Sequence, residues 1–200
     1  MILLLLACAT LSSDASSDVE PQASQPDATA TGVPQTEDPV VSAELLPPHF
    51  SADAIRMAMP VGTTLVFRTA KIDVLADGSG IMGMETRDVQ WEVLAADSEQ
   101  TTIRYGPASA AGESTERTHS WAELATHSQF SAQMTTRQDS VSVTVPAGTF
   151  KCTRYTVREA GGEVSVYEFA QGLAGPPVQM VQTVSGQERM RMSLVRRAIP

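Results

Sequence analysis

The fold is indicated most clearly by the stretch Val141-Ser142-Val143-Thr144-Val145-Pro146-Ala147-Gly148-Thr149-Phe150. Its three valines alternate with hydroxyl residues, which is the period of a strand with one buried and one exposed face. Pro146 cannot donate a main-chain hydrogen bond to a neighbouring strand, and Gly148 allows a turn conformation that is closed to most residues. The stretch therefore predicts a strand, a tight turn and a second strand that begins near Phe150.

Further apolar or alternating runs flank this hairpin on both sides, and most of them are bounded by turn residues. They recur at roughly the 8–12-residue spacing of a meander, sandwich or barrel. The sequence thus predicts a mainly β domain built on an antiparallel sheet. The remaining strand candidates are residues 64–68, 88–94, 101–105, 164–169, 178–184 and 188–195, with a turn at 77–80.

One short helix is expected to interrupt the sheet. Ser120-Trp121-Ala122-Glu123 has the capping-box pattern, in which the serine hydroxyl accepts the N3 amide and the glutamate reaches back to the cap. Trp121 and Leu124 follow at helical spacing, and the helical turn is expected to end near Phe130. We expect these two side chains to plug one side of a curved sheet.

The first 48 residues differ in composition from the rest of the chain. Residues 9–48 hold seven of the 23 acidic residues and none of the 14 basic ones, and they contain no aromatic residue. Such an acidic, proline-punctuated segment buries too little apolar surface to offset the cost of ordering it. We therefore expect residues 8–48 to be a disordered linker and residues 49–200 to be one globular domain. This domain is nearly neutral, which argues against a nucleic-acid partner.

The apolar run at the start of the sequence ends in Leu5-Leu6-Ala7-Cys8. This tetrad resembles the lipobox of bacterial lipoprotein precursors. The resemblance implies that the Cys8 thiol is acylated, that the chain is cut before it, and that Cys8 anchors the protein in a membrane. Residues 1–7 are too few to span a bilayer and lack the basic part of a signal peptide, so they are expected to be a truncated signal-like segment. Ala9 after the lipidated cysteine resembles the outer-membrane sorting choice of two-membrane bacteria.

The C-terminal half carries a second resemblance. The strand and turn at 143–152, together with Gly172-Leu173-Ala174-Gly175-Pro176-Pro177-Val178-Gln179-Met180, are similar to a pattern in uncharacterised β-rich envelope proteins. That group lies beside lipoprotein carriers and lipocalin-like half-barrels. The resemblance implies a curved antiparallel sheet or half-barrel with one short helix.

Residues with catalytic or metal-binding potential are few. The three histidines are His49, His119 and His127, and their spacing does not match a zinc motif, so they are expected to be exposed polar residues. Cys152 has no predicted base or orienting partner, and we expect it to pack as a small apolar residue. No phosphate-binding, dinucleotide or nucleophile-elbow motif is present. The sequence therefore predicts no enzyme activity, no metal site and no cofactor.

Two groups of residues could still serve a binding function. The only concentration of positive charge is Arg189, Arg191, Arg196 and Arg197. The first two alternate with Met190, Met192 and Leu194 and are expected to be the solvated face of a strand, with a patch for a polyanion or phospholipid head groups as the alternative. The methionines are expected to fill the core, with a cavity for an acyl chain as the alternative. They lie at positions 57, 59, 82, 84, 134, 180, 190 and 192, with a ninth at position 1.

Two functions remain open on these grounds. The first is a lipid-anchored envelope protein, in the outer membrane of a two-membrane bacterium, whose β-domain binds a small apolar ligand or lipid. The second is a structural or assembly lipoprotein that docks on another envelope protein. A cavity with polar groups at its mouth would favour the first. A filled interior with an exposed apolar patch would favour the second.

Overall fold

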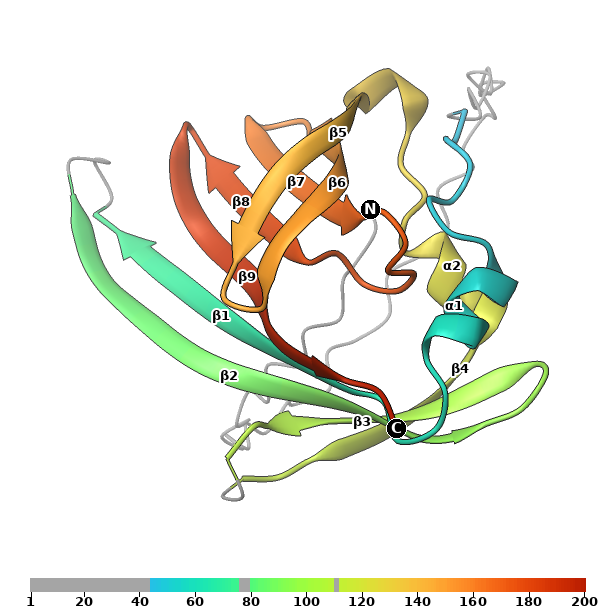
Figure 1. Ribbon diagram of the computed structural model, residues 1–200. Coiled ribbons are helices and arrows are strands. Elements are labelled where there is room, and N and C mark those ends of the chain that lie inside the picture. Colours follow the sequence, from blue (N-terminus) through green and yellow to red (C-terminus); the bar gives the residue numbers. More distant parts are fainter. Residues whose placement is uncertain (1–43, 76–79, 110–111) are drawn as a thin grey trace, which may run out of the picture. The chain divides into compact units, whose positions relative to one another are not determined.

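The computed structural model describes residues 44–75, 80–109 and 112–200 of the chain. The lipobox with Cys8, the expected linker up to residue 43 and most of the expected turn at 77–80 lie outside the described residues. The strands form a single antiparallel sheet (Figure 1). Their bounds are β1 Thr64–Val74, β2 Ile81–Ala96, β3 Gln100–Pro107, β4 Thr115–Ser120, β5 Thr135–Val145, β6 Gly148–Arg158, β7 Glu163–Ala170, β8 Gln179–Val184 and β9 Gln187–Ala198.

The strand order across the sheet is β4-β3-β2-β1-β9-β8-β7-β6-β5, so the first and last strands of the chain are neighbours at its centre. The sheet is open and bends on itself. Ala147, in the turn between β5 and β6, donates its amide to the carbonyl of Leu194 on β9 at 3.1 Å. Leu194 in turn donates its amide to the carbonyl of Val178 at 2.8 Å. The expected curved antiparallel sheet or half-barrel is therefore confirmed, and the two motifs of the C-terminal resemblance meet at Leu194.

Two short helices, α1 (Ala52–Ala58) and α2 (Trp121–Thr126), lie side by side against one face of the sheet (Figure 1). Trp121 of α2 and Ile55 of α1 belong to the main hydrophobic core, together with Phe67 of β1 and Val93 of β2. The helices thus cover the inner face of the sheet at β1 and β2, as was expected for Trp121.

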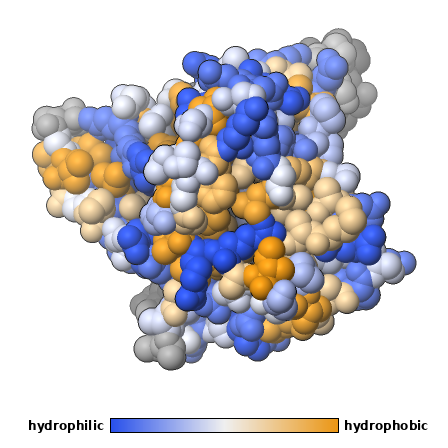
Figure 2. All heavy atoms as spheres, viewed as in Figure 1, coloured by the Kyte–Doolittle hydropathy of each residue, from blue (hydrophilic) through white to orange (hydrophobic). Residues whose placement is uncertain are grey.

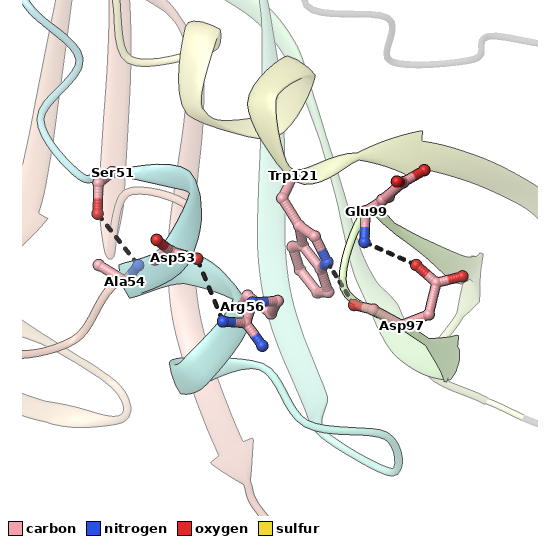
Figure 3. Close-up of polar contacts among 7 residues, drawn as sticks. All are labelled: Ser51, Asp53, Ala54, Arg56, Asp97, Glu99 and Trp121. Atoms are coloured by element: carbon pink, nitrogen blue, oxygen red, sulfur yellow. Dashed lines mark hydrogen bonds and ion pairs between the residues drawn. The ribbon is translucent and has the colours of Figure 1, made fainter.

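Serine caps begin both helices. Ser51 Oγ accepts a hydrogen bond from the Ala54 amide at 3.2 Å (Figure 3), and Ser120 Oγ accepts one from the Glu123 amide at 3.0 Å. The Trp121 indole donates to the Asp97 carbonyl at 3.0 Å, which ties α2 to the β2–β3 turn. The first half of the predicted capping box is confirmed, whereas the Glu123 carboxylate contacts the His119 ring.

Three elements were not predicted, and each has a reason in the sequence. Helix α1 buries only Ile55 deeply along its length, so it shows no apolar stripe at helical period. Strand β4 reads Thr-Glu-Arg-Thr-His-Ser and has no apolar residue to alternate; it forms an edge that pairs with β3 alone. The third element is a 3-10 turn at Ala132–Met134. The expectation of a single helix was therefore wrong.

The boundary of the folded domain also lies earlier than expected. Leu45 forms an antiparallel bridge with Ser131, and the Leu46 amide donates to the Phe130 carbonyl at 2.8 Å. The Leu46 side chain packs against a second apolar cluster that contains Phe130 and Tyr155. Residues 44–48, assigned to the linker, thus contact the domain. The linker was assigned from its average composition, in which two adjacent leucines have little weight.

Candidate binding surfaces

A small pocket lies against the main hydrophobic core of the described residues. Its free volume is about 10 Å³, which is at the lower limit for one water molecule. The pocket is therefore not a ready cavity for an acyl chain. Its walls are Met59, Leu65, Phe67, Leu173, Ala174, Pro176, Pro177, Val178, Leu194 and Arg197.

The methionines do not gather around a cavity in the described part of the chain. Met59, Met180 and Met192 are buried in the main core. Met82 and Met84 are instead 67% exposed. The expectation that methionine fills the core holds for the first three and fails for the two on β2. It also fails for Met57 and Met134, which are 73% and 38% exposed.

His119 links helix α2 to the inner face of the sheet. Its Nε2 contacts the Tyr105 hydroxyl at 3.1 Å, and its Nδ1 contacts Glu123 Oε1 at 3.1 Å. Burial raises the pKa of Tyr105 to about 12, so its hydroxyl stays protonated and is not an activated nucleophile. The His119 side chain is only 14% exposed, and the expectation of a solvated histidine was wrong because the ring joins two elements.

His49 holds the N-terminal segment against the domain. Its amide donates to Ser128 Oγ at 2.9 Å, and its Nδ1 contacts the Tyr155 hydroxyl at 3.1 Å. The ring lies 5.1 Å from that of Phe169. Burial, followed by the charge of Arg137, lowers the pKa of His49. His127, which caps the C-terminus of α2, also has a lowered pKa because it is partly buried. Both were expected to be exposed; His49 is instead half-buried, whereas His127 is exposed as expected.

These lowered pKa values predict that acid destabilises the fold. In the unfolded chain His49 binds a proton at the usual pKa of histidine, whereas in the folded protein it binds one only at lower pH. Its contribution to the free energy of unfolding is therefore complete above the usual pKa and is lost as the pH falls through the lowered pKa. We expect the free energy of unfolding to fall between about pH 7.5 and about pH 5.5, and to fall less in His49→Phe. Urea denaturation at several pH values measures both slopes, and equal slopes would contradict the role of His49.

Cys152 is fully buried in the main core, and burial raises the pKa of its thiol to about 11. A thiol in that state is a poor nucleophile at neutral pH.

Close to Cys152, a polar network lies across β6, β7, β8 and β9. Arg154 Nε donates to Glu168 Oε1 at 2.8 Å, and the Glu168 side chain is only 5% exposed. With the Gln179 amide oriented to match its neighbours, its nitrogen donates to Glu168 Oε2 at 2.8 Å, and its oxygen accepts from Arg191 Nη1 at 2.9 Å. Arg191 also pairs with Glu188. Each charge in this network has a partner of opposite sign, so the network serves to hold the strands together.

The β1–β2 hairpin extends beyond its neighbours in the sheet. Pairing between β1 and β9 stops at Lys71, and pairing between β2 and β3 stops at Val89. From there to the turn the two strands pair with each other and, among the described strands, with nothing else. An isolated two-stranded hairpin is marginally stable in water, so this extension is a candidate for support by a partner.

The outer face of this extension is apolar. Ile72 lies opposite Met84 in the register, and Val74 lies opposite Ile81. Because side chains alternate along β1, Ile72 and Val74 point away from the face that carries Phe67. Hydrophobic surface gathers at the left of Figure 2, over the end of this hairpin. The exposed fractions are 70% for Ile81, 67% for Met82, 67% for Met84 and 40% for Leu75.

This surface was not expected from the sequence. Residues 77–80 were expected to form a turn between apolar runs, and the methionines were expected to fill the core. The alternation of Met82 and Met84 with Gly83 and Glu85 was the available signal. It indicates a strand with one apolar face, but it does not show that no second layer of the domain covers that face.

Comparison with known proteins gives similarities of fold only. No protein-family model matches the sequence, and no curated protein matches it. A presumed lipoprotein from Parabacteroides distasonis superposes with a TM-score of 0.43 and 10% identity, over 70% of this chain and 98% of that one. The complex of MucA and MucB from Pseudomonas aeruginosa gives 0.46 and 13%, over 74% of this chain and 55% of that one. Another structure of MucB with MucA gives 0.47 and 12%, with the same coverage.

Proposed function

We propose that this chain is a lipid-anchored protein of the cell envelope that docks on another envelope protein through the outer face of the β1–β2 extension. The observation that supports docking is an apolar face on the part of the hairpin that no other described strand flanks. On this face Met82 and Met84 are 67% exposed, and Ile72 and Val74 are half-buried. Methionine suits such a surface because its flexible side chain adapts to a partner. The proposal includes no enzymatic step.

A protein partner fits the extension better than a bilayer does. Along residues 81–87 the edge of β2 that faces away from β1 pairs with no described strand. The backbone amides and carbonyls along that edge need hydrogen-bond partners, which the hydrocarbon of a membrane cannot supply. An extended segment of another protein supplies them by adding a strand, while its side chains cover the apolar face.

A carrier of apolar ligands has less support. The described pocket has a free volume of about 10 Å³, whereas sites for small molecules usually measure several hundred. No described helix is long and apolar enough to span a membrane. Attachment in this proposal therefore depends on acylation of Cys8, and Ala9 after it favours the outer membrane.

Photo-crosslinking in the native host tests the docking surface. A photoreactive residue at position 84 is expected to give one discrete adduct, which Met82→Ser abolishes because it removes part of the apolar face. The matched control is position 57, a methionine on α1 that is 73% exposed. Met82→Ser is expected to leave the melting temperature within about 2 °C, because the side chain is exposed. Equal adducts from positions 84 and 57 would contradict the proposal.

Anchoring is tested separately by detergent partitioning of the full chain expressed behind a complete signal peptide. We expect Cys8→Ser to move the protein from the detergent phase to the aqueous phase, since the acyl chains supply the attachment. If Cys8→Ser partitioned as the wild type does, the lipid anchor would be excluded while the docking surface would remain open to its own test.

A further inference from the structure

The segment 44–49 forms a strap across the second apolar cluster. At the start of the strap, the Leu46 amide donates to the Phe130 carbonyl at 2.8 Å, and the Ala132 amide donates to the Glu44 carbonyl at 2.8 Å. The Leu46 side chain packs against the cluster, whereas the two prolines that follow it have no main-chain N–H to donate. A segment held by so few contacts belongs to the part of a fold that opens most easily.

His49 fastens the other end of the strap. Its amide donates to Ser128 Oγ at 2.9 Å, and its ring contacts the Tyr155 hydroxyl and the ring of Phe169. Phe50, the next residue, packs against both apolar clusters, so the chain from Phe50 onward is held by contacts of its own. The strap can therefore come away as far as His49 without disturbing helix α1.

Two charged groups act on the His49 ring, and both lie on β5. Arg137 repels a positive charge on the ring, and Asp139 attracts it. Asp139 is already paired with Arg137 at 3.0 Å, and no described carboxylate forms an ion pair with His49. Burial contributes most to the lowered pKa of His49, Arg137 lowers it further, and Asp139 raises it by less.

The other groups packed on the ring carry no charge. Strand β7 contributes Phe169, the segment after α2 contributes the Ser128 hydroxyl, and β6 contributes the hydroxyl of Tyr155, whose pKa is raised by burial. The charge of His127, which is adjacent to Ser128, acts on residues of β4 and α2. The Nε2 of His49 has no hydrogen-bond partner among the described residues. A protonated ring would therefore be a half-buried charge with an unpaired N–H.

We propose that residues 44–49 are an acid-released strap: protonation of His49 detaches them from Phe130 and Tyr155, while the sheet and both helices stay in place. In the detached strap the His49 ring is solvated and binds a proton at the usual pKa of histidine, so acid favours the detached form. The strap is closed above that pKa and detaches as the pH falls below it.

Detachment lengthens the connection between Cys8 and the sheet. Residues 44–49, once free of the domain, span at most about 20 Å when fully extended. In acid the docking surface on the β1–β2 extension therefore reaches further from the membrane. This consequence rests on the proposed anchoring at Cys8, whereas the detachment itself does not, so failure of either test leaves the other idea standing.

Nuclear Overhauser effects between aromatic rings test the detachment at matched distances. The ring centroids of His49 and Phe169 are 5.1 Å apart, and those of Phe67 and Trp91 are also 5.1 Å apart. In the full chain carrying Cys8→Ser, both effects are expected at about pH 7.5. At about pH 5 the effect between His49 and Phe169 is expected to weaken at least about fivefold, whereas the effect between Phe67 and Trp91 keeps its intensity.

Three variants separate the strap from a general effect of acid. His49→Phe is expected to keep its ring contact with Phe169 at both pH values. Arg137→Gln leaves Asp139 free to attract the proton on His49, so the strap is expected to stay closed to a lower pH than in the wild type. His127→Gln is the matched control and is expected to detach as the wild type does.

The charge of the His49 ring is read from the chemical shifts of its own ring protons in the same spectra. A contact between His49 and Phe169 that persists once the ring is charged would overturn the proposal. Loss of the contact between Phe67 and Trp91 at the same pH would overturn it too, because the whole domain would then be unfolding. The same holds for acid detachment in His49→Phe, for detachment of Arg137→Gln at the wild-type pH, and for a strap that stays closed in His127→Gln.

Discussion

Replacement of Phe67 by alanine is expected to lower the free energy of unfolding by about 3–5 kcal/mol. Phe67 lies on β1 at the centre of the sheet, is 1% exposed, and contacts the Trp91 ring at a centroid distance of 5.1 Å. Its removal leaves a cavity that the helices α1 and α2 can only partly close. Chemical denaturation of the wild type and Phe67→Ala measures the loss.

Phe150 provides the matched control for that experiment. The sequence pattern predicts that Phe150 is the aromatic residue on which the C-terminal hairpin depends. In the structure it is only half-buried beside Val143, near the edge strand β5. We therefore expect Phe150→Ala to destabilise clearly less than Phe67→Ala, and an equal or larger loss would contradict the position of the core at β1.

The second large effect is expected at Arg154. Arg154→Met leaves the Glu168 carboxylate, which is 5% exposed, without its principal partner. Breaking a buried ion pair from one side typically costs about 3–5 kcal/mol, and here Gln179 still donates to the carboxylate, so the lower end is expected. Urea denaturation at neutral pH measures the change.

A double variant shows whether the cost comes from the stranded charge. Arg154→Met combined with Glu168→Leu removes both charges and leaves apolar side chains beside Cys152. It is expected to recover most of the stability lost in the single variant, because an apolar pair of similar volume often replaces a buried ion pair without loss. A double variant as unstable as the single one would assign the effect to packing instead.

The sequence predicts this sheet well where one strand face is apolar. The alternation at 141–145 and the turn at Gly148, whose φ of 136° is in the region that favours glycine, are both confirmed. Strand β4 was not predicted because an edge strand without a covered face needs no apolar residues. The Leu45–Ser131 bridge was not predicted because one pair of leucines in an acidic linker makes no repeating apolar pattern.

The candidate sites could not be predicted, because they depend on pairing between distant strands. Met82 and Met84 carry the same pattern as core residues, and only the length of β2 relative to β3 shows that they are exposed. Arg197 and Arg196 are adjacent and chemically identical. Adjacent residues of a strand point to opposite faces, and the register shift between Val66 and Phe67 in the pairing of β1 with β9 places Arg197 rather than Arg196 on the inner face. The sequence carries no sign of this shift.

The pairing of the first strand with the last has a consequence for how the sheet is assembled. β1 can complete its second ladder only with β9, so β1–β4 and β5–β8 remain separate until the final residues of the chain arrive. Contacts between such distant segments make folding slow, since a long loop must close before they form. During that interval β1 and β8 each expose an unpaired edge that invites aggregation. Loss of the last dozen residues would consequently split the sheet at its centre rather than trim its margin.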